Sequence, residues 1–398
     1  MANDALLNAK KQQNDEFYTL YEYIQKEVNA YLEYNADAFK DKTVLCPCDD
    51  PEWSNFTKFF AQNFESLGLK KLISTSYAIE SKKSKYEQYH QMSFFEINSP
   101  LYDEKKSNER GRIFTLTRRN KKKIDFDDLE WKYLEGDGDF QSEEVKKLRD
   151  EADIIVTNPP FSLFRDFVAW ILEANKKFLI IGQIGMATYK EIFPEIKYNR
   201  LWVGVTCNNE DMVFEVPEGA NVKPKDREKA ARMGYVGNYT RQGNACWFTN
   251  MDHGRRHSPL SLMTMDDNLK YSKHKDLKEN GYLTYYNYDG IDVPYVDAIP
   301  SDYDGVMGVP TSFLDKYNPD QFEIVDNGAY APKTLDHIAY KSKGIICYEK
   351  DGEAVWTTPY TVSERKAGNG LRLNENGLPG GLPYGRILIR RVRNDHNA

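Results

Sequence analysis

The stretch Asp153-Ile154-Ile155-Val156-Thr157-Asn158-Pro159-Pro160-Phe161-Ser162 decides how this chain is expected to fold. The run Asp153 to Val156 is mostly β-branched, which is typical of a buried strand. The two prolines that follow end the strand sharply, because proline has no N–H for a sheet ladder. Ser162 is then expected to cap a helix, in which apolar residues recur at helical spacing from Leu163 to Leu172. The tetrapeptide Asn158–Phe161 is therefore predicted at the carboxyl end of a strand, where open α/β sheets bind their ligands.

The chemistry of this tetrapeptide suits the recognition of a flat amine. Asn158 offers a neutral side-chain carbonyl, and the Pro159 carbonyl is held stiffly by the proline after it. Two acceptors can take the two hydrogens of an exocyclic NH₂ group, which leaves the nitrogen lone pair aimed at an electrophile. Phe161 supplies a face on which a planar base can stack. The structural alternative is a Pro-Pro turn that simply ends a strand and begins a helix.

Strand and helix patterns alternate on both sides of this stretch, which implies a mainly parallel sheet with right-handed crossovers. An antiparallel pair of strands is expected at the sheet edge, from 201–205 and 245–249. The other expected strands are 44–46, 72–76, 113–116 and 178–182, and the expected helices are 14–34 and 54–67.

The chain is expected to divide into three parts. Residues 1–40 form an N-terminal helical segment, and residues 41–255 form an α/β domain that includes a charged, basic excursion at 80–130. Beyond about residue 256 the alternation is lost, and Tyr, Gly, Asn and Asp become frequent. Residues 256–398 are therefore predicted to form a second, less regular region.

Composition narrows the class of protein. No apolar run approaches ~18 residues and the N-terminus lacks an apolar signal core, so neither membrane insertion nor secretion is expected. The five cysteines show no repeated spacing, which argues against a disulfide framework and a zinc site. A reducing, cytoplasmic setting is expected, and no metal is implied.

The net charge of −7 is unusual for a nucleic-acid-binding protein. The cations are nevertheless clustered, and the local field matters more than the total charge. The alternative for each cluster is a solvated surface run. The residues expected to contact nucleic acid are Arg118, Arg119, Lys121, Lys122, Lys123, Arg255 and Arg256.

The tetrapeptide Asn158-Pro159-Pro160-Phe161 resembles motif IV of the amino-methyltransferases, which methylate an exocyclic nitrogen using S-adenosylmethionine. Asn-Pro-Pro-Phe is the form found in DNA N6-adenine and protein-glutamine enzymes, and the resemblance implies that all four residues are catalytic. The segment Val44–Phe56 contains no glycine where generic methyltransferases have a glycine-rich turn. It instead resembles the EcoRI-type DNA adenine methyltransferases, in which Cys-Asp-Asp-Pro-x-x-Ser-x-Phe replaces that turn.

The resemblance also implies where the cofactor S-adenosylmethionine binds. Asp15–Thr19 resembles motif X, which lies beside the methionine part, and Gly136–Phe140 resembles motif III, whose acid bonds the adenine amine. Asp49 and Asp50 could meet the ammonium or the ribose hydroxyls. The strand that carries motif II ends in Ser74-Thr75-Ser76 and not in an acid, which leaves the ribose contact unassigned. The expected cofactor-binding residues are Phe17, Tyr18, Thr19, Cys48, Asp49, Asp50, Ser54, Asp139, Phe140 and Asn158.

The resemblance covers roughly residues 14–393. It implies a Rossmann-like methyltransferase domain, a C-terminal target-recognition region, and methyl transfer to adenine N6 in duplex DNA after the base leaves the stack. A companion restriction endonuclease acting on the same site is an expected partner, unless the enzyme is an orphan or phage counterpart. Two alternatives stay open: an RNA N6-adenine or protein-glutamine methyltransferase, and a catalytically silent nucleic-acid-binding protein on the same fold.

Overall fold

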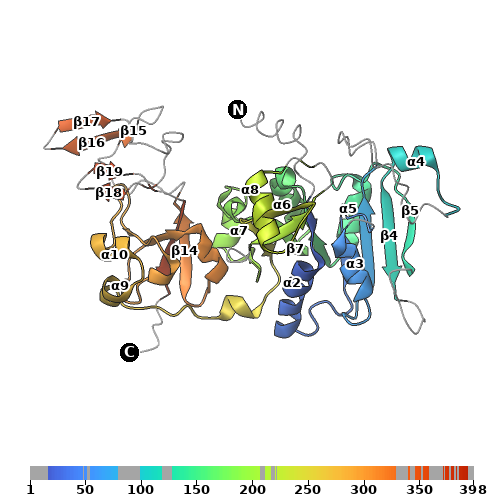
Figure 1. The fold of residues 1–398 in the computed structure, drawn as a ribbon, viewed down its shortest axis with the longest axis horizontal. Helices are drawn as coiled ribbons and strands as arrows, with labels where there is room; N and C mark the ends of the chain where they lie inside the picture. Colours follow the sequence, from blue (N-terminus) through green and yellow to red (C-terminus); the bar gives the residue numbers. More distant parts are fainter. Residues whose placement is uncertain are drawn as a thin grey trace. The chain divides into compact units, whose positions relative to one another are not determined.

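The computed structural model describes residues 17–47, 49–51, 54–78, 99–118, 128–206, 211–216, 220, 222–328 and parts of 339–392 (Figure 1). These residues form two compact units. Unit 1 lies within Met1–Ile184 and Leu201–Gly254, and unit 2 lies within Gly185–Arg200 and Arg255–Ala398. The chain thus changes unit one residue before the expected boundary at 255/256, and residues 185–200 belong with the second unit.

Unit 1 contains a large mixed sheet with strand order β5-β4-β3-β2-β6-β7-β11-β8. Its strands are β2 (Thr43–Cys46), β3 (Lys71–Ser76), β4 (Arg112–Thr117), β5 (Glu130–Tyr133), β6 (Ile154–Thr157), β7 (Lys177–Gln183), β8 (Trp202–Val203) and β11 (Ala245–Thr249). The four central strands, β3, β2, β6 and β7, are parallel, and the flanking strands pair antiparallel. The mixed α/β class is therefore confirmed, as is the expected antiparallel pair at one edge.

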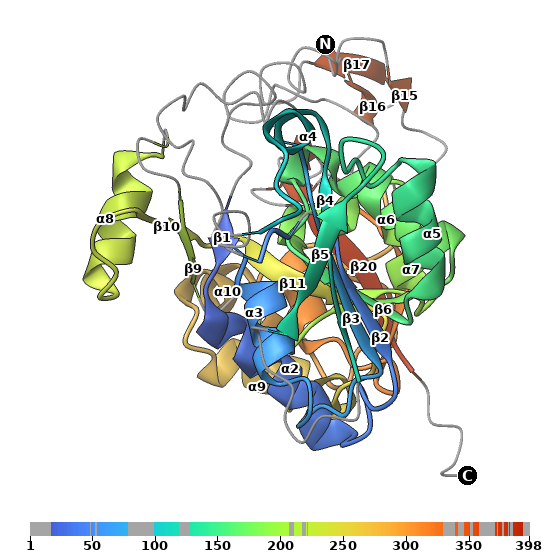
Figure 2. The ribbon, with the colours of Figure 1, turned by 90° about the vertical axis from the view of Figure 1, so that its right-hand side faces the viewer.

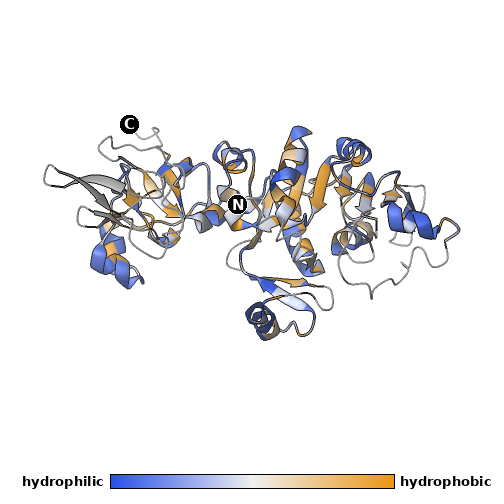
Figure 3. Ribbon diagram, turned by 90° about the horizontal axis from the view of Figure 1, so that it is seen from above, coloured by the Kyte–Doolittle hydropathy of each residue, from blue (hydrophilic) through white to orange (hydrophobic). Residues whose placement is uncertain are grey.

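Helices cover both faces of this sheet (Figure 2). The four helices that do so are α2 (Tyr21–Tyr34), α3 (Asn55–Gln62), α5 (Glu143–Glu151) and α6 (Phe164–Glu173). Helices α2 and α3 pack with Val44, Cys46 and Val156 in one hydrophobic cluster. Residues 45 and 155 alternate to the opposite face, because successive side chains in a strand point to opposite sides. The central strands are strongly hydrophobic in Figure 3, because helices cover both faces of the sheet.

Two expected helix starts are wrong. The helix expected over 14–34 begins at Tyr21, because Tyr18–Thr19 pairs as strand β1 instead. Ser162 is not an N-cap, because Phe161–Leu163 forms a 3-10 turn (η3) before α6, which places Ser162 inside the turn. By contrast, the Ser54 hydroxyl does cap α3, accepting from the Phe56 N–H at 3.1 Å.

A small second sheet in unit 1 has the order β1-β9-β10. Strands β9 (Met212–Glu215) and β10 (Tyr239–Gln242) are antiparallel, and helix α8 (Pro224–Arg232) lies between them in sequence. Strand β1 pairs with β9 on its other side. The N-terminal segment is thereby tied to a region about 200 residues away in the chain.

The described part of the 80–130 excursion belongs to the large sheet. Helix α4 (Glu104–Glu109) leads into β4, which pairs antiparallel with β3. The basic residues at 80–98 and 119–127 lie outside the described residues.

Unit 2 is built around a four-stranded sheet with the order β12-β13-β20-β14. Arg386 on β20 forms a buried ion pair with Asp292 on β12 at 2.7 Å, and the Tyr285 hydroxyl donates to the same carboxylate. Its strands are β12 (Ile291–Asp292), β13 (Met307–Pro310), β14 (Phe322–Asn327), β15 (Ala339–Tyr340), β16 (Ile346–Lys350), β17 (Glu353–Thr357), β18 (Leu373–Glu375), β19 (Leu378–Gly380) and β20 (Arg386–Arg391), and its α-helices are α7 (Phe193–Lys197), α9 (Met265–Tyr271) and α10 (Lys275–Asn280). In the part of the chain that the structure describes, no helix is long and apolar enough to cross a membrane.

Glu27 is a buried carboxylate that attaches α2 to the chain after β8. It accepts hydrogen bonds from the N–H groups of Val205 and Thr206, at 2.9 and 2.7 Å, and from the Tyr31 hydroxyl at 3.0 Å. Burial raises the pKa of Glu27, and the two backbone donors partly oppose that rise. The side chain therefore satisfies three donors, of which the Thr206 N–H and the Tyr31 hydroxyl belong to buried residues.

We expect Glu27→Ala to lower the free energy of unfolding of unit 1 by about 1–3 kcal/mol for each buried donor that it leaves unpaired. Chemical denaturation measures this change. Glu33→Ala on the same helix is the matched control, because Glu33 is exposed and its loss should change stability by less than about 0.5 kcal/mol. Equal stabilities of the two variants would contradict the assigned role of Glu27.

Candidate active site

The order of the central strands creates a crevice at the carboxyl ends of β2 and β6. The chain leaves β2 through α3 to reach β3 on one side, whereas β6 pairs with β2 on the other side. This reversal of direction is a topological switch point, the position at which open α/β sheets bind ligands. The turn after β2 carries Asp49 and Asp50, and the turn after β6 carries Asn158–Phe161. The topology therefore brings together the two segments that the sequence singled out.

Hydroxyl groups hold the turn after β2 in place of a glycine-rich loop. The backbone carbonyl of Asp49 accepts from the Thr57 hydroxyl on α3 at 3.2 Å and from the Ser74 hydroxyl on β3. The Thr157 hydroxyl, at the end of β6, donates to the Pro47 carbonyl at 3.0 Å. Three neighbouring elements thus fix one turn, so the position of Asp49 does not depend on glycine.

The Asp49 side chain is buried and only partly satisfied. Its Oδ1 accepts from the Ser54 hydroxyl at 2.7 Å. Within the described residues, no hydrogen-bond partner reaches its Oδ2. Burial raises the pKa of Asp49 to about 7, against the opposing effect of the Thr157 and Ser54 hydroxyls. A buried carboxylate oxygen of this kind is suited to a ligand that carries positive charge or hydrogen-bond donors.

Asp50 has a different environment. It forms a buried ion pair with Arg112 on β4, with 2.8 Å between Oδ2 and the guanidinium nitrogen. Arg112 also donates from Nε to the Ser76 hydroxyl at the end of β3, at 3.2 Å. Arg112 therefore connects the turn after β2 with the end of the motif II strand. Sequence reasoning did not predict this role for Arg112, although its position directly before the expected strand at 113–116 was a signal.

Asn158 is positioned by the N-terminal segment. Its Nδ2 donates to the Phe17 carbonyl at 2.7 Å, which fixes the orientation of the amide. The opposite atom, Oδ1, is buried and accepts no hydrogen bond from the residues that the structure describes. A buried acceptor without a donor costs free energy, so Oδ1 is poised to accept from a ligand amine.

The aromatic rings beside Asn158 form a stack. The Phe161 ring lies on the Phe17 ring with 5.7 Å between centroids and 27° between planes, and Phe17 meets the edge of Phe214 on β9. Phe161 is only partly buried. One face of its ring is therefore supported by Phe17, which leaves stacking on the other face for a planar ligand.

The segment resembling motif III packs against the end of β3. Gly138 has a φ of +89°, and a Cβ there would collide with the Ser76 carbonyl, so glycine is required. Asp139 follows, half-buried, and accepts from the Gln141 N–H at 2.8 Å. Phe140 is fully buried against Phe167 and Trp170. The structure thus places Asp139 near the crevice, whereas Phe140 packs in the core below it.

Two further expected cofactor residues, Tyr18 and Thr19, lie on β1. Tyr18 and Thr19 form that strand, and the Thr19 carbonyl accepts from Asn55 on α3 at 2.8 Å. The Thr19 hydroxyl is buried, and it has no hydrogen-bond partner in the described part of the chain. Cys48 lies outside the described residues.

Arg118 is the expected DNA-contacting cation that the structure describes in unit 1, and it does not lie at this crevice. Arg118 follows β4, and its N–H reaches the Lys70 carbonyl just before β3, so Arg118 lies at the amino ends of the parallel strands. That edge is opposite to Asn158. In unit 2, Arg255 pairs with Asp315 at 2.6 Å and Arg256 donates to Asn199 at 2.9 Å. Arg119, Lys121, Lys122 and Lys123 lie outside the described residues, so these DNA contacts stay predictions.

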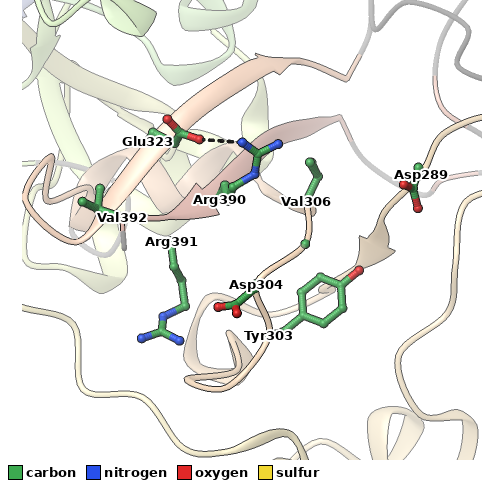
Figure 4. Close-up of a pocket in the computed structure, with 9 residues that line it drawn as sticks. Asp289, Tyr303, Asp304, Val306, Glu323, Arg390, Arg391 and Val392 are labelled. Carbon is green, nitrogen blue, oxygen red and sulfur yellow. Dashed lines mark hydrogen bonds and ion pairs between the residues drawn. The ribbon is translucent and has the colours of Figure 1, made fainter. Parts of the chain in front are cut away.

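Unit 2 has an open pocket of about 540 Å³ (Figure 4). Glu323 and Arg390 form an ion pair across part of its wall at 3.1 Å. The carboxylates of Asp289, Asp304 and Glu323 outnumber the two guanidinium groups, so the pocket is not a concentrated positive surface. It is lined by Asp289, Tyr303, Asp304, Gly305, Val306, Glu323, Arg390, Arg391 and Val392.

Comparisons with known proteins show which family the chain resembles. The family model described as "Adenine-specific methyltransferase EcoRI" matches residues 5–392. The chain is 41% identical to the Type II methyltransferase M.EcoRI of Escherichia coli over 81% of this chain and 89% of the relative. It is 36% identical to the Type II methyltransferase M.MpnI of Mycoplasma pneumoniae over 82% of this chain and 87% of the relative. No solved structure matches the chain significantly.

The chain therefore belongs to the EcoRI family of adenine-specific methyltransferases. This membership confirms the family that the segments at 44–56 and 158–161 predicted. It also confirms the expected class of enzyme and the requirement for a methyl donor.

We expect Arg112→Met to lower the free energy of unfolding of unit 1 by about 3–5 kcal/mol, because it leaves the buried Asp50 carboxylate without its charged partner. Chemical denaturation measures this change. Arg110→Met is the matched control two residues away, since Arg110 is partly exposed and its pair with Glu135 spans 3.3 Å at the surface. A loss in Arg112→Met no larger than in Arg110→Met would mean that the buried pair has no structural role.

Proposed function

We propose that this protein transfers a methyl group from S-adenosylmethionine to N6 of adenine in duplex DNA, after the base has left the stack. The observation that carries the proposal is the buried Asn158 Oδ1 at the switch point of the sheet, an acceptor that no donor among the described residues reaches, near the Phe161 ring. Relatives named Type II methyltransferases favour DNA over RNA or protein glutamine as the substrate. They also favour a restriction–modification setting with a companion endonuclease.

The residues of the crevice fit S-adenosylmethionine. This cofactor carries positive charge on its sulfonium and ammonium groups and donors on its ribose and adenine. The chain offers Asp49 Oδ2 and the Thr19 hydroxyl, both buried and without a hydrogen-bond partner among the described residues. We assign Asp49 to the cationic part, and Asp139 to the adenine amine. Asp50 is engaged by Arg112, so we assign it to positioning of the turn.

Catalysis by these residues is mainly positioning. The carbonyl oxygens of Asn158 and Pro159 accept the two amine hydrogens, which orients the nitrogen lone pair along the line of attack. Phe161 holds the plane of the base, with Phe17 supporting the ring from behind. S-adenosylmethionine supplies the methyl group when it is bound. Because the N6 proton becomes acidic once nitrogen carries the methyl group, the site needs no strong base before attack.

We further propose that unit 1 is a Rossmann-like methyltransferase domain. In this domain, the cofactor and the target base bind in the same crevice. Unit 2 then serves as the target-recognition region. The chain of unit 2 is less regular than that of unit 1, with short strands and helices of 5 to 7 residues. Loops and short elements on a scaffold are where recognition residues concentrate.

Asn158→Ala should lower turnover by roughly 10²–10³, because it removes one oriented acceptor at the reacting nitrogen. Affinity for S-adenosylmethionine should change only a few-fold. Transfer of a labelled methyl group to duplex DNA measures the turnover, and calorimetry measures the affinity for S-adenosylmethionine. The assay includes RNA and protein as acceptors. Labelling of either in place of DNA would refute the proposed substrate.

Asn158→Asp distinguishes the hydrogen bond that Nδ2 donates to Phe17 from the hydrogen bond that Oδ1 is proposed to accept from the target amine. An aspartate keeps an acceptor oxygen for the amine but cannot donate to the Phe17 carbonyl. We expect it to retain more activity than Asn158→Ala. Near wild-type turnover by the alanine variant would exclude Asn158 from catalysis.

The raised pKa of Asp49 leads us to expect that cofactor binding depends on pH. Its pKa of about 7 means that it is largely protonated below pH 7 and ionised above it. A cationic ligand binds the ionised form, so affinity should fall on acidification, by up to about tenfold for each pH unit below 7. Calorimetry between about pH 5.5 and 7.5 should also show proton release on binding. Asp49→Asn should bind more weakly and without this pH dependence. Equal pH profiles of the two proteins would contradict the assignment.

A further inference from the structure

Residues 222–242 form a projection from unit 1, which we call the arm. It consists of helix α8, the loop 233–238 and strand β10, and it lies to one side of the large sheet in Figure 2. The buried Ala230 packs α8 onto β10, whereas most other side chains of α8 are exposed. None of the sequence motifs falls in this segment.

The arm is connected to the candidate active site through two strand pairings. Strand β10 pairs with β9, and β9 pairs with β1, so that Glu215 lies opposite both Tyr239 and Tyr18. The next residue toward the N-terminus is Phe17, whose carbonyl accepts from Asn158. The small sheet is therefore at the carboxyl edge of the parallel strands, where a target base must enter.

A second attachment fixes the loop of the arm. The Tyr235 hydroxyl donates to the Glu22 carboxylate at the start of α2, and the Tyr235 ring packs on Tyr239 at 5.6 Å. The loop is thus bound to the same end of α2 that adjoins β1. With attachments through both β10 and the loop, the arm is fixed relative to β1, which follows directly after Phe17.

The arm is basic in a protein of net charge −7. Residues 223–232 contain five cations and only two carboxylates. Lys225, Lys229 and Arg232 recur at intervals of four and three residues, which places them on one face of α8. Such a row of cations is complementary to a row of phosphates.

The tip of the arm is apolar and exposed. Val236 is 78% exposed, the largest exposed fraction among the large hydrophobic side chains that the structure describes, and Met233 is 41% exposed. The flanking residues Gly234 and Gly237 have φ of +97° and +109°, conformations that favour glycine and shape the tip. An exposed apolar side chain beside a basic helix is a combination found where proteins contact base or sugar edges.

We propose that the arm is a DNA-contacting element of unit 1, which binds phosphates beside the target adenine through α8 and places Val236 against the groove. The proposal rests on duplex DNA being the substrate, as argued above. According to this proposal, unit 1 contributes part of the DNA-binding surface. The competing interpretation is a solvated helix on a polar hairpin.

The first test neutralises two cations of the arm. Lys225→Gln/Lys229→Gln should weaken binding to any duplex and flatten the slope of log affinity against log salt by about 1–2, because each lost phosphate contact removes about one released counterion. Lys146→Gln/Lys147→Gln is the matched control. It removes the same charge from helix α5 of the same unit, which lies outside the arm. Its salt slope should equal that of the wild type.

The second test concerns the tip. Val236→Asp places a carboxylate beside the phosphates and should weaken DNA binding several-fold. Ala169→Asp is the control: it adds the same charge at an exposed position of α6 and should leave DNA binding unchanged. Affinity for S-adenosylmethionine should be unchanged in all four variants.

The outcomes separate this proposal from the one on which it rests. If the wild type fails to methylate adenine in duplex DNA, the proposed substrate is wrong. If the wild type methylates DNA and the arm variants bind it with the slope and affinity of their controls, the arm proposal is overturned. It is also overturned if the arm variants lose cofactor affinity together with DNA affinity, since the arm would then act only by supporting β1.

Discussion

The backbone carbonyl of Asp49 is the constraint on which the rest of the site depends. Two hydroxyl groups from different elements, Thr57 on α3 and Ser74 on β3, donate to this one oxygen. A glycine-rich turn approaches a cofactor through a lack of side chains, whereas this turn is rigid because side chains bind its backbone. The arrangement fixes Asp49 relative to β6, whose last residue, Thr157, donates to the same turn at Pro47.

Buried charge near the turn is divided between two adjacent carboxylates with different environments. Asp50 is held in a buried ion pair with Arg112. Asp49 lacks a cationic partner among the described residues, and its pKa is raised. One acid of the Asp-Asp pair therefore serves the architecture, and the other can respond to a ligand. The geometry of β4, which carries Arg112, is what makes this division possible.

Local pattern was sufficient to predict the strands that form the crevice, because β2 and β6 are short, apolar and ended by Pro-containing turns. It was insufficient wherever a partner lies far away in sequence. Strand β1 has only two residues, Tyr18 and Thr19, and it exists because β9 pairs with it. Both residues were therefore predicted to belong to the helix at 14–34. The role of Arg112 was not predicted, because the sequence around it does not show that Asp50 lies opposite. The edge of the sheet at which Arg118 lies was also not predicted, because it follows from the antiparallel pairing of β4 with β3.

The hydrogen bond from Asn158 to Phe17 joins residues 141 positions apart in sequence. A contact of such high sequence separation forms late, because the entropy of closing the long intervening loop must first be overcome. Secondary structure and much of the large sheet can form before the N-terminal segment docks beside β9. A newly synthesised chain would therefore reach a compact state earlier than it forms the contact between Asn158 and Phe17. The orientation of the Asn158 amide is thereby linked to completion of the fold.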